Sequence, residues 1–434
     1  MQDDDDAAGQ WPVAPGLNEL GGRGAALAAL VRRARAEVPF YAHHLAGVGE
    51  FAPDGSDAEL AALPTCTKAD LAGWGTFPLA AVPLAGCLRV SATSGTTGPR
   101  LFVGYTRADW DAVGAAGGRV ARHIGFGPGE TLLNVLGAGL WIGGPCFDEL
   151  ARAAGAALFP AGPTNPEQVL EWCATFGLTA ITTTPSYARL WVERATAQGA
   201  DLSALPLRMA FVGGEGSSPA LRAQVVAAFG DGFRWQEMYG STEVGGAILG
   251  YGSPEAGFED GLNIATDEFV VELLDPDADR PVVPGEVGEL TVTAFREASP
   301  LIRYRTRDLV RTIDGRDSRG LPRVSTVLGR IDDALKVRGA LVYPSIVEEL
   351  IVAALPPGAE WRIELSREPG ALDVLAVTVE LDGGSVAVAD RCQDLADAIG
   401  LRALVRPVVR SVPIGTFERF TGKARRVEDR RPRD

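Results

Sequence analysis

Residues 207–220 read LRMAFVGGEGSSPA, and this stretch decides the fold class. It begins with an apolar run at 207–212, typical of a buried strand, and continues into a glycine-rich turn. A helix is predicted next, from about Pro219 to Phe229, because proline suits the first helical position and Gly230 follows as a stop. A strand, a tight turn and a helix in this order are the units from which parallel sheets are built.

The same alternation extends from residue 157 to residue 238. A short apolar run at 157–159 precedes Asn165 and Pro166, which together predict the start of a helix. Residues 181–184 are predicted as a strand and 186–193 as part of a helix. Repeated strand–helix alternation predicts a parallel sheet covered on both faces.

Both ends of the chain carry further local signals. A leading helix is predicted over 24–44 from its apolar spacing, and a capping box at Thr67 starts another. After residue 285 the sequence pattern changes to the alternation that is typical of strands, for example at 289–295. Beyond Asp332 we expect helices at 345–354 and 386–399, with strands at 361–366 and 374–381. The expected fold class is α/β: a large N-terminal domain (1–331) with parallel sheets covered by helices plus a β-rich portion, and a small α+β C-terminal domain (332–434).

Composition excludes several classes of protein. The 434 residues carry a net charge of −15, which disfavours binding to nucleic acid. No apolar run approaches the roughly 18 residues of a membrane span, and the acidic start (Asp3 to Asp6) does not resemble a signal peptide. We therefore expect a cytoplasmic protein without membrane contact. The five cysteines show no CxxC spacing and form no ligand pattern with the three histidines, so they are interpreted as small core residues.

One candidate site is a hydroxyl-rich loop between two short apolar runs. Its backbone and hydroxyls suit a polyphosphate, although the ending of a Walker A loop is absent. A simple hairpin turn is an equally weighted alternative. The candidate residues are Ser91, Thr93, Ser94, Gly95, Thr96, Thr97 and Gly98.

Two further motifs point to a nucleotide. Residues 238–243 (MYGSTE) follow a strand-like run, so that Tyr239 could stack on a purine and Glu243 could hold Mg²⁺; a turn with a surface glutamate is the alternative. Residues 303–308 (RYRTRD) end in Asp308, which could accept hydrogen bonds from ribose hydroxyls. A solvated strand of mixed charge is the alternative there.

Two charged segments complete the set, residues 329–339 (GRIDDALKVRG) and 421–427 (TGKARRV). Singly, they are typical of a charged linker and a basic tail. In this order, however, the five segments together resemble the adenylate-forming superfamily of acyl-CoA synthetases, adenylation domains and luciferases. The phenylacetate–CoA ligase group is the most similar, and it shares RAEVPFY (35–41), LPTCTKADL (63–71) and GYTRAD (104–109). The similarity runs from about residue 30 to residue 431.

This resemblance implies an AMP-forming acid–CoA ligase that uses ATP, Mg²⁺ and coenzyme A. Lys423, Thr242 and Glu243 would be catalytic, with Glu243 binding the metal. The large domain would bind nucleotide and acid, and the small domain would move on a hinge at Asp332. The remaining nucleotide-binding residues would be the hydroxyl-rich loop with Gly214, Glu215, Tyr239, Gly240, Asp308 and Arg330. The acceptor half-reaction would use Lys336, Arg338 and Gly339.

The acid is expected to be aromatic or arylalkanoic. The residues expected to line its pocket are Leu136, Trp141, Tyr187, Gly245, Gly246 and Ala247. Leu136 stands where phenylacetate enzymes carry tyrosine, so a larger or para-substituted ring is expected to fit. Core packing is the alternative for Trp141.

Other outcomes stay open at this point. The acceptor could be a carrier-protein thiol or an amine in a biosynthetic pathway, or the chain could be a non-catalytic nucleotide-binding module. The expected partners are a small carboxylic acid, ATP, and CoA or a carrier protein, with homodimerisation left open.

Overall fold

A computed structural model describes residues 16–49, 56–93, 100–255, 261–356, 359–368, 372–382, 386–419 and 426–431. The chain forms two compact units, and each unit joins two separate segments. The first unit comprises Met1–Gly162 and Gln236–Thr326, and the second comprises Pro163–Trp235 and Val327–Asp434. Each unit is described by itself.

The N-terminal segment of the first unit is mainly helical. Its helices are α1 (Gly24–Glu37), α2 (Pro39–His44), α3 (Asp57–Ala62), α4 (Lys68–Ala72), α5 (Arg107–His123) and α6 (Gly143–Ala154), with a 3₁₀ turn η1 (Leu84–Gly86). Its strands are β1 (Arg89–Ala92), β2 (Phe102–Tyr105), β3 (Thr131–Leu133) and β4 (Ala157–Phe159). β1 and β2 form an antiparallel hairpin, whereas β3 and β4 are parallel.

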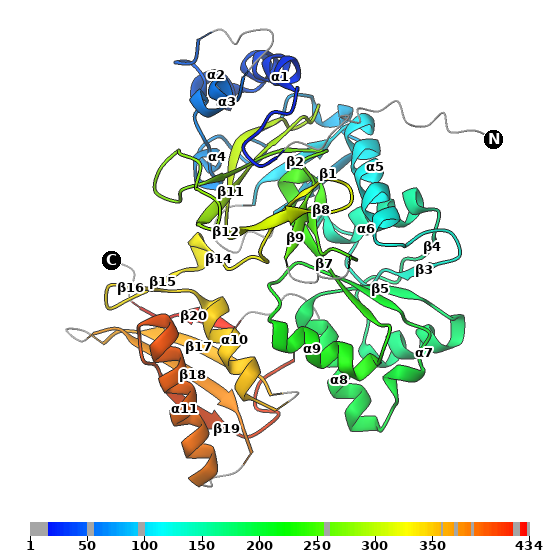
Figure 1. Cartoon of the computed structure of the whole chain (residues 1–434), viewed down its shortest axis with the longest axis vertical. Helices are drawn as coiled ribbons and strands as arrows, with labels where there is room; N and C mark the ends of the chain where they lie inside the picture. Colours follow the sequence, from blue (N-terminus) through cyan, green and yellow to red (C-terminus); the bar gives the residue numbers. More distant parts are fainter. Residues whose placement is uncertain are drawn as a thin grey trace. The chain divides into compact units, whose positions relative to one another are not determined.

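The second segment of this unit is almost entirely β-structure. It holds β7 (Arg234–Ser241), η3 (Thr242–Val244), β8 (Gly246–Tyr251), β9 (Leu262–Ile264), β10 (Val270–Leu274), β11 (Val287–Ala294), β12 (Leu301–Arg316) and β13 (Pro322–Val324). The strands lie in the order β10-β11-β12-β13-β9-β8-β7, and the paired neighbours are antiparallel (Figure 1). This is the β-rich portion that the sequence predicts.

The second unit begins with strand–helix alternation. It contains α7 (Pro166–Phe176), β5 (Ala180–Thr183), α8 (Pro185–Gln198), η2 (Leu202–Ala204), β6 (Met209–Val212) and α9 (Pro219–Phe229). β5 and β6 are parallel, as the alternation predicts. Three of the helices start with an N-cap side chain followed by proline, and Gly230 ends α9 at a positive φ.

The C-terminal segment of this unit has its own sheet and core. Its elements are β14 (Gly329–Arg330), η4 (Ile331–Asp333), β15 (Leu335–Val337), β16 (Ala340–Val342), α10 (Pro344–Ala354), β17 (Trp361–Ser366), β18 (Val374–Glu380), α11 (Val386–Ala403), β19 (Val408–Val412) and β20 (Val427–Asp429). The mixed sheet has the order β19-β18-β17-β20, and α10 and α11 pack beside it (Figure 1). Val347, Ile351, Trp361, Val377 and Leu395 belong to one buried cluster. The predicted boundary near Asp332 stays a prediction, because the second unit also contains residues 163–235.

Inside the second unit, α8 contacts this C-terminal segment through charged and aromatic groups. Arg189 donates to Glu360 Oε1 at 2.6 Å and to the carbonyl oxygen of Ala359 at 3.0 Å. Its guanidinium also lies 4.9 Å from the ring centroid of Trp361. All of these partners are buried, so the contact is a desolvated ion pair rather than a surface one.

Most local predictions are confirmed, and one is wrong. Thr67 and Asp70 form the predicted capping box at the start of α4. The single helix predicted over 24–44 is instead two helices, because Val38 is extended (φ −112°, ψ 110°) and Pro39 begins α2. The residue before a proline is disfavoured in the helical region, which explains the break. Cys66, Cys146 and Cys173 are buried, while Cys87 and Cys392 are half-buried, and all five are free thiols. No helix within the described ranges has the length and apolar character needed to cross a bilayer.

Candidate functional site

The RYRTRD motif lies on an irregular part of β12. Between the pairs Glu289↔Leu309 and Thr291↔Arg305, β12 advances by four residues while β11 advances by two. Arg307 adopts a positive φ of 67° within this bulge, and its backbone N–H donates to Glu289 Oε1 at 2.9 Å. A bulge redirects side chains at the point where it interrupts the ladder, and here it carries Asp308.

The strand that carries this motif is buried, so the solvated-strand alternative is wrong. Arg303 is fully buried and donates to both carboxylate oxygens of Glu272, from Nε at 2.9 Å and from Nη2 at 2.8 Å. Arg305 pairs with Glu289 at 2.9 Å. The charges of this strand are therefore compensated inside the protein, and the motif is held in a fixed conformation.

Asp308 is held by the tyrosine that the sequence assigns to adenine. The Tyr239 hydroxyl donates to Asp308 Oδ2 at 2.7 Å, and the backbone N–H of Asp308 donates to Thr306 Oγ1 at 3.2 Å. Asp308 is buried and Tyr239 is half-buried, so the phenol ring keeps an accessible edge. The structure thus brings together two residues that the sequence predicts for one nucleotide.

Glu243 lies on the short 3₁₀ turn η3 directly after β7. It is only 6% exposed, so it is not the surface glutamate of the alternative interpretation. The Tyr304 hydroxyl donates to Glu243 Oε1 at 2.9 Å. The start of the same turn is also anchored, because the Tyr105 hydroxyl donates to the carbonyl oxygen of Thr242.

The turn around Glu243 requires glycine at its base. A Cβ atom on Gly240 would lie 1.8 Å from the carbonyl oxygen of Gly246, and Gly246 itself has a φ of +106°. Only glycine tolerates such an approach and such a backbone conformation. The pairing of Ser241 with Gly246 then places Glu243 at the tip of a tight loop.

The donor set around Glu243 suits Mg²⁺ bound together with phosphates. In the part of the chain that the structure describes, no arginine, lysine or histidine forms an ion pair with Glu243, although a buried carboxylate needs a compensating charge. Ser241 Oγ nearby is buried and has no hydrogen-bond partner among the described residues. The same ranges contain no group of three or more His, Cys, Asp or Glu side chains arranged as a metal site. Mg²⁺ in such sites takes one or two carboxylates and completes its shell with phosphate oxygens and water.

The start of the hydroxyl-rich loop lies on β1. Ser91 and Thr93 are buried, and Thr93 Oγ1 accepts from the backbone N–H of Leu101 at 3.1 Å. The backbone N–H of Ala92 donates to the carbonyl oxygen of Leu140 at 2.9 Å, which joins the base of this loop to the predicted acid-pocket segment. The other predicted members, Ser94, Gly95, Thr96, Thr97 and Gly98, lie outside the described residues.

The first unit also brings together most of the predicted acid pocket. Cys146 on α6 connects its two halves, because Cys146 Sγ accepts from the backbone N–H of Ala247 at 3.3 Å and packs against Gly246. Gly246 and Ala247 contact Cys146, while the Leu136 carbonyl oxygen and the Trp141 ring lie against Gly144 and Gly143 at the start of the same helix. Gly245, the remaining member in this unit, precedes Gly246 and packs against Val113. Trp141 is 39% exposed, so the core-packing alternative for this side chain is wrong.

The remaining predicted residues of the large domain lie in the second unit. Tyr187 is buried at the start of α8, and its hydroxyl donates to the carbonyl oxygen of Thr164. Burial raises the pKa of Tyr187 to about 12. The Glu215 carboxylate accepts from the Ser186 hydroxyl at 2.7 Å and from the Ser186 backbone N–H at 3.2 Å. Glu215 therefore holds the exposed Gly214 turn against the N-terminus of α8.

The residues predicted for the acceptor half-reaction form an exposed hairpin. Lys336 lies on β15, and Arg338 and Gly339 make the two-residue turn to β16 with φ values of 50° and 88°. Two positive φ angles are typical of the tight turns that match strand twist. Arg330 and Asp332 are exposed just before this hairpin, and Lys423 lies outside the described residues.

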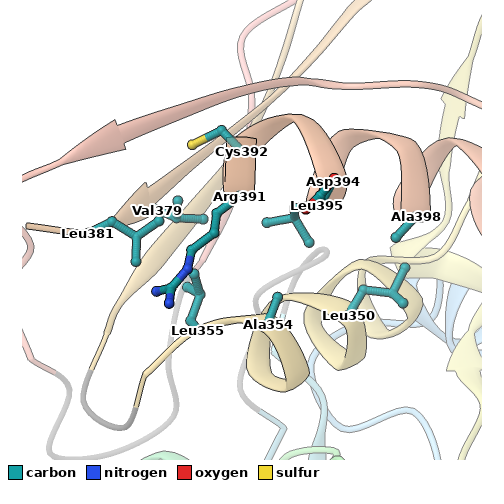
Figure 2. Close-up of a pocket in the computed structure, with 10 residues that line it drawn as sticks. All are labelled: Leu350, Ala354, Leu355, Val379, Leu381, Arg391, Cys392, Asp394, Leu395 and Ala398. Carbon is teal, nitrogen blue, oxygen red and sulfur yellow. The ribbon is translucent and has the colours of Figure 1, made fainter. Parts of the chain in front are cut away.

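A cavity of about 290 Å³ lies elsewhere in the second unit, between α10, α11 and β18 (Figure 2). Its lining is mostly aliphatic, with Arg391, Cys392 and Asp394 from α11 as the polar members. No residue of the predicted site lines this cavity.

Comparison with known proteins gives the family. The phenylacetate-coenzyme A ligase of Escherichia coli (strain K12) is 34% identical over 409 residues, which cover 92% of each chain. The chain belongs to the AMP-binding enzyme family. The family model described as AMP-binding enzyme matches residues 87–294, and the one described as AMP-binding enzyme C-terminal domain matches residues 339–431.

Other members of the AMP-binding enzyme family agree with this placement. The phenylacetate-coenzyme A ligase of Thermus thermophilus is 35% identical over 351 residues, 79% of this chain and 77% of the relative. Among solved structures, 2-hydroxyisobutyryl-CoA ligase in its postadenylation state matches with a TM-score of 0.82 at 25% identity, over 93% of this chain and 88% of that one. The resemblance inferred from the motifs and the α/β fold class are thereby confirmed.

Some residues of this AMP-binding enzyme were not singled out by the sequence. Tyr304 stands inside the RYRTRD motif, Tyr105 stands inside the GYTRAD stretch, and Cys146 is interpreted from the sequence only as a small core residue. No local pattern shows what these three residues contact. Their partners are 61, 137 and 101 residues away along the chain. Only the aromatic character of the motif gave a signal, and it pointed to Tyr304 alone.

Proposed function

We propose that this protein activates an aromatic or arylalkanoic carboxylic acid with ATP and transfers the acyl group to coenzyme A. The arrangement that supports the nucleotide half of this proposal is the meeting of Tyr239, Glu243 and Asp308 in one unit. The identity of 31–35% with phenylacetate-coenzyme A ligases over most of the chain supports the acid and the acceptor.

In the first half-reaction, a carboxylate oxygen of the acid attacks the α-phosphorus of ATP, and the bond to pyrophosphate breaks. Both reactants are anions, so charge must be compensated where they meet. We assign Lys423 to bridge the carboxylate and the α-phosphate, and Thr242 to contact the α-phosphate. Mg²⁺, held by Glu243, would neutralise phosphate charge. Asp308 would bind the ribose hydroxyls, with Tyr239 and Gly240 beside the adenine.

In the second half-reaction, the thiol sulfur of coenzyme A attacks the acyl carbon, and the bond to AMP breaks as the thiol proton is lost. Domains 1–331 and 332–434 would rearrange about Asp332 between the two steps. The exposed hairpin of Lys336, Arg338 and Gly339 would then serve the acceptor. The separate hydrophobic core of residues 335–405 supports a small domain that can move as a body.

The acid pocket supports a flat apolar substrate. Trp141 offers an exposed indole, while Gly245 and Gly246 leave room next to the backbone. Leu136 is buried and presents no hydroxyl to the ring. These features favour an aryl or arylalkanoic acid over acetate or a long fatty acid.

Because ATP and coenzyme A are cytoplasmic metabolites, we further propose a cytoplasmic enzyme. Its oligomeric state, including a homodimer, is measurable by light scattering.

The decisive experiment is a pyrophosphate-release screen over aryl, arylalkanoic, short-chain and long-chain acids, with and without coenzyme A. Mass spectrometry of the products identifies the acceptor, and Glu243→Gln serves as the inactive control. We expect acid-dependent pyrophosphate release and an acyl-CoA product. Release without a CoA product would favour a carrier protein or an amine as acceptor. No acid-dependent release from any acid would favour a non-catalytic nucleotide-binding module.

A further inference from the structure

Two tyrosines and two carboxylates of the first unit are arranged reciprocally. Tyr239 and Glu243 are four residues apart at the end of β7, and Tyr304 and Asp308 are four residues apart on β12. Each tyrosine donates to the carboxylate of the other segment: Tyr239 to Asp308 at 2.7 Å, and Tyr304 to Glu243 at 2.9 Å. We call these four side chains the phenol–carboxylate bracket.

Three of the four side chains of the bracket are buried. Tyr304, Glu243 and Asp308 are 5–6% exposed, whereas Tyr239 is half-buried. Hydrogen bonds to a buried charged group are shorter and stronger than those between neutral groups. Each carboxylate is therefore held in one orientation by a phenol from the opposite segment.

The choice of a phenol as donor has a chemical consequence. An arginine or lysine in place of Tyr304 would cancel the charge of Glu243 and repel a cation bound to it. A neutral hydroxyl orients the carboxylate and leaves its negative charge in place. A carboxylate accepts at several lone-pair positions, so one hydrogen bond on Oε1 is compatible with a metal ion.

Resting on the function proposed above, we propose that the bracket positions the two carboxylates that bind the two ends of the nucleotide. Tyr304 is the positioning residue for the metal-binding carboxylate Glu243. The hydroxyl of Tyr239, apart from its ring, is the positioning group for the ribose-binding carboxylate Asp308. The reciprocal bonds fix the two carboxylates relative to each other, so that one ATP molecule meets both.

The two halves of the bracket can be measured separately, because AMP carries the ribose but needs no metal. AMP binding is measured by calorimetry in the presence of EDTA, and Mn²⁺ binding by electron paramagnetic resonance in the presence of ATP without acid. The variants are Tyr304→Phe and Tyr239→Phe, each of which removes one hydroxyl. The matched control is Tyr251→Phe, which removes a buried hydroxyl bonded to His123 and Arg319 in the same unit.

Tyr304→Phe should weaken Mn²⁺ binding about 10-fold or more, the scale for losing an outer partner of a metal ligand, and leave AMP binding within about two-fold. Tyr239→Phe should weaken AMP binding about 10-fold and change Mn²⁺ binding less. Tyr251→Phe should change neither. Adding Tyr304→Phe to a Glu243→Gln variant should weaken Mn²⁺ binding little further, because the carboxylate that it positions is already gone.

Unchanged Mn²⁺ binding in Tyr304→Phe would overturn the inference. So would an equal loss of both ligands in Tyr304→Phe, since that pattern indicates general structural damage. The inference would also be overturned if Tyr304→Phe weakened Mn²⁺ binding as much in the Glu243→Gln background as it does in the wild-type protein. Failure of the wild-type protein to bind either AMP or ATP would instead overturn the proposed function, and this outcome is visible before any variant is made.

Discussion

Replacing Glu272 by glutamine should destabilise the first unit strongly. Glu272 on β10 is the buried partner of Arg303, and the two side chains form a bidentate pair with N–O distances of 2.9 and 2.8 Å. Arg303 Nη1 also donates to the carbonyl oxygen of Ala61 at 2.9 Å and to that of Leu63. The pair thus joins β12 to β10 and to the C-terminal end of α3, directly before Tyr304 of the bracket.

The magnitude follows from burial. Arg303 is 0% exposed and Glu272 3% exposed, so the guanidinium that loses its partner stays in a desolvated position. Removing one member of a buried pair costs about 3–5 kcal/mol, and the glutamine amide oxygen still accepts one bond, which favours the lower end. For a unit of this size, about 3 kcal/mol corresponds to a fall in Tm of roughly 6–12 °C.

The assay is thermal unfolding followed by tryptophan fluorescence, with Arg280→Gln as the control. Arg280 pairs with Asp275 but is 62% exposed in its side chain, so its loss should cost less than about 1 kcal/mol. The double variant Glu272→Gln/Arg303→Met should cost less than the sum of the two single variants, because each single variant leaves one buried charge unpaired and the double variant leaves none. A Tm shift in Glu272→Gln no larger than that in Arg280→Gln would refute the reasoning.

Four further predictions concern the site and its surroundings. Lys423→Ala should slow adenylate formation by roughly 10²-fold while sparing thioester formation from presynthesised adenylate; equal damage to the two half-reactions, assayed separately, would contradict its role. Asp308→Ala should raise the KM for ATP about 10-fold or more and that for the acid far less, so an unchanged ATP dependence would make it a structural carboxylate. Leu136→Tyr should shift the ratio of kcat/KM values toward smaller aromatic acids by roughly 1–3 kcal/mol. Turnover of short-chain or long-chain aliphatic acids faster than that of every aromatic acid tested would contradict the proposed aromatic pocket. Hydrogen bonds from Ser318 lower the pKa of Glu255 from 4.5 to about 2. The contribution of Glu255 to stability is therefore present above about pH 4.5 and is lost as the pH falls toward 2. Glu255→Gln should lower Tm at pH 7 but not at pH 2, and an equal shift of Tm at both pH values would contradict this prediction.

Local patterns were sufficient for most of the secondary structure. The capping box at Thr67, the N-cap and proline at residues 165–166 and the stop at Gly230 act within one helical turn, so neighbouring residues decide them. The prediction of one continuous helix over 24–44 failed at Val38 for an equally local reason, since the proline at position 39 restricts the backbone of the residue before it. The resemblance of ordered motifs then indicated the family, which the relatives confirm.

The sequence by itself determined which residues are predicted to carry the chemistry, because the motifs of a nucleotide site are short and contiguous. Only the tertiary structure decided how they meet. Tyr239 and Asp308 are separated by 69 residues, and Tyr304 and Glu243 by 61, so no periodicity relates them. The charged strand at 303–308 is typical of a solvated surface, yet it is buried because Glu272 and Glu289 supply the counter-charges from two other strands. Burial of a charge depends on partners that the fold brings in from a distance, and a local pattern contains no information about them.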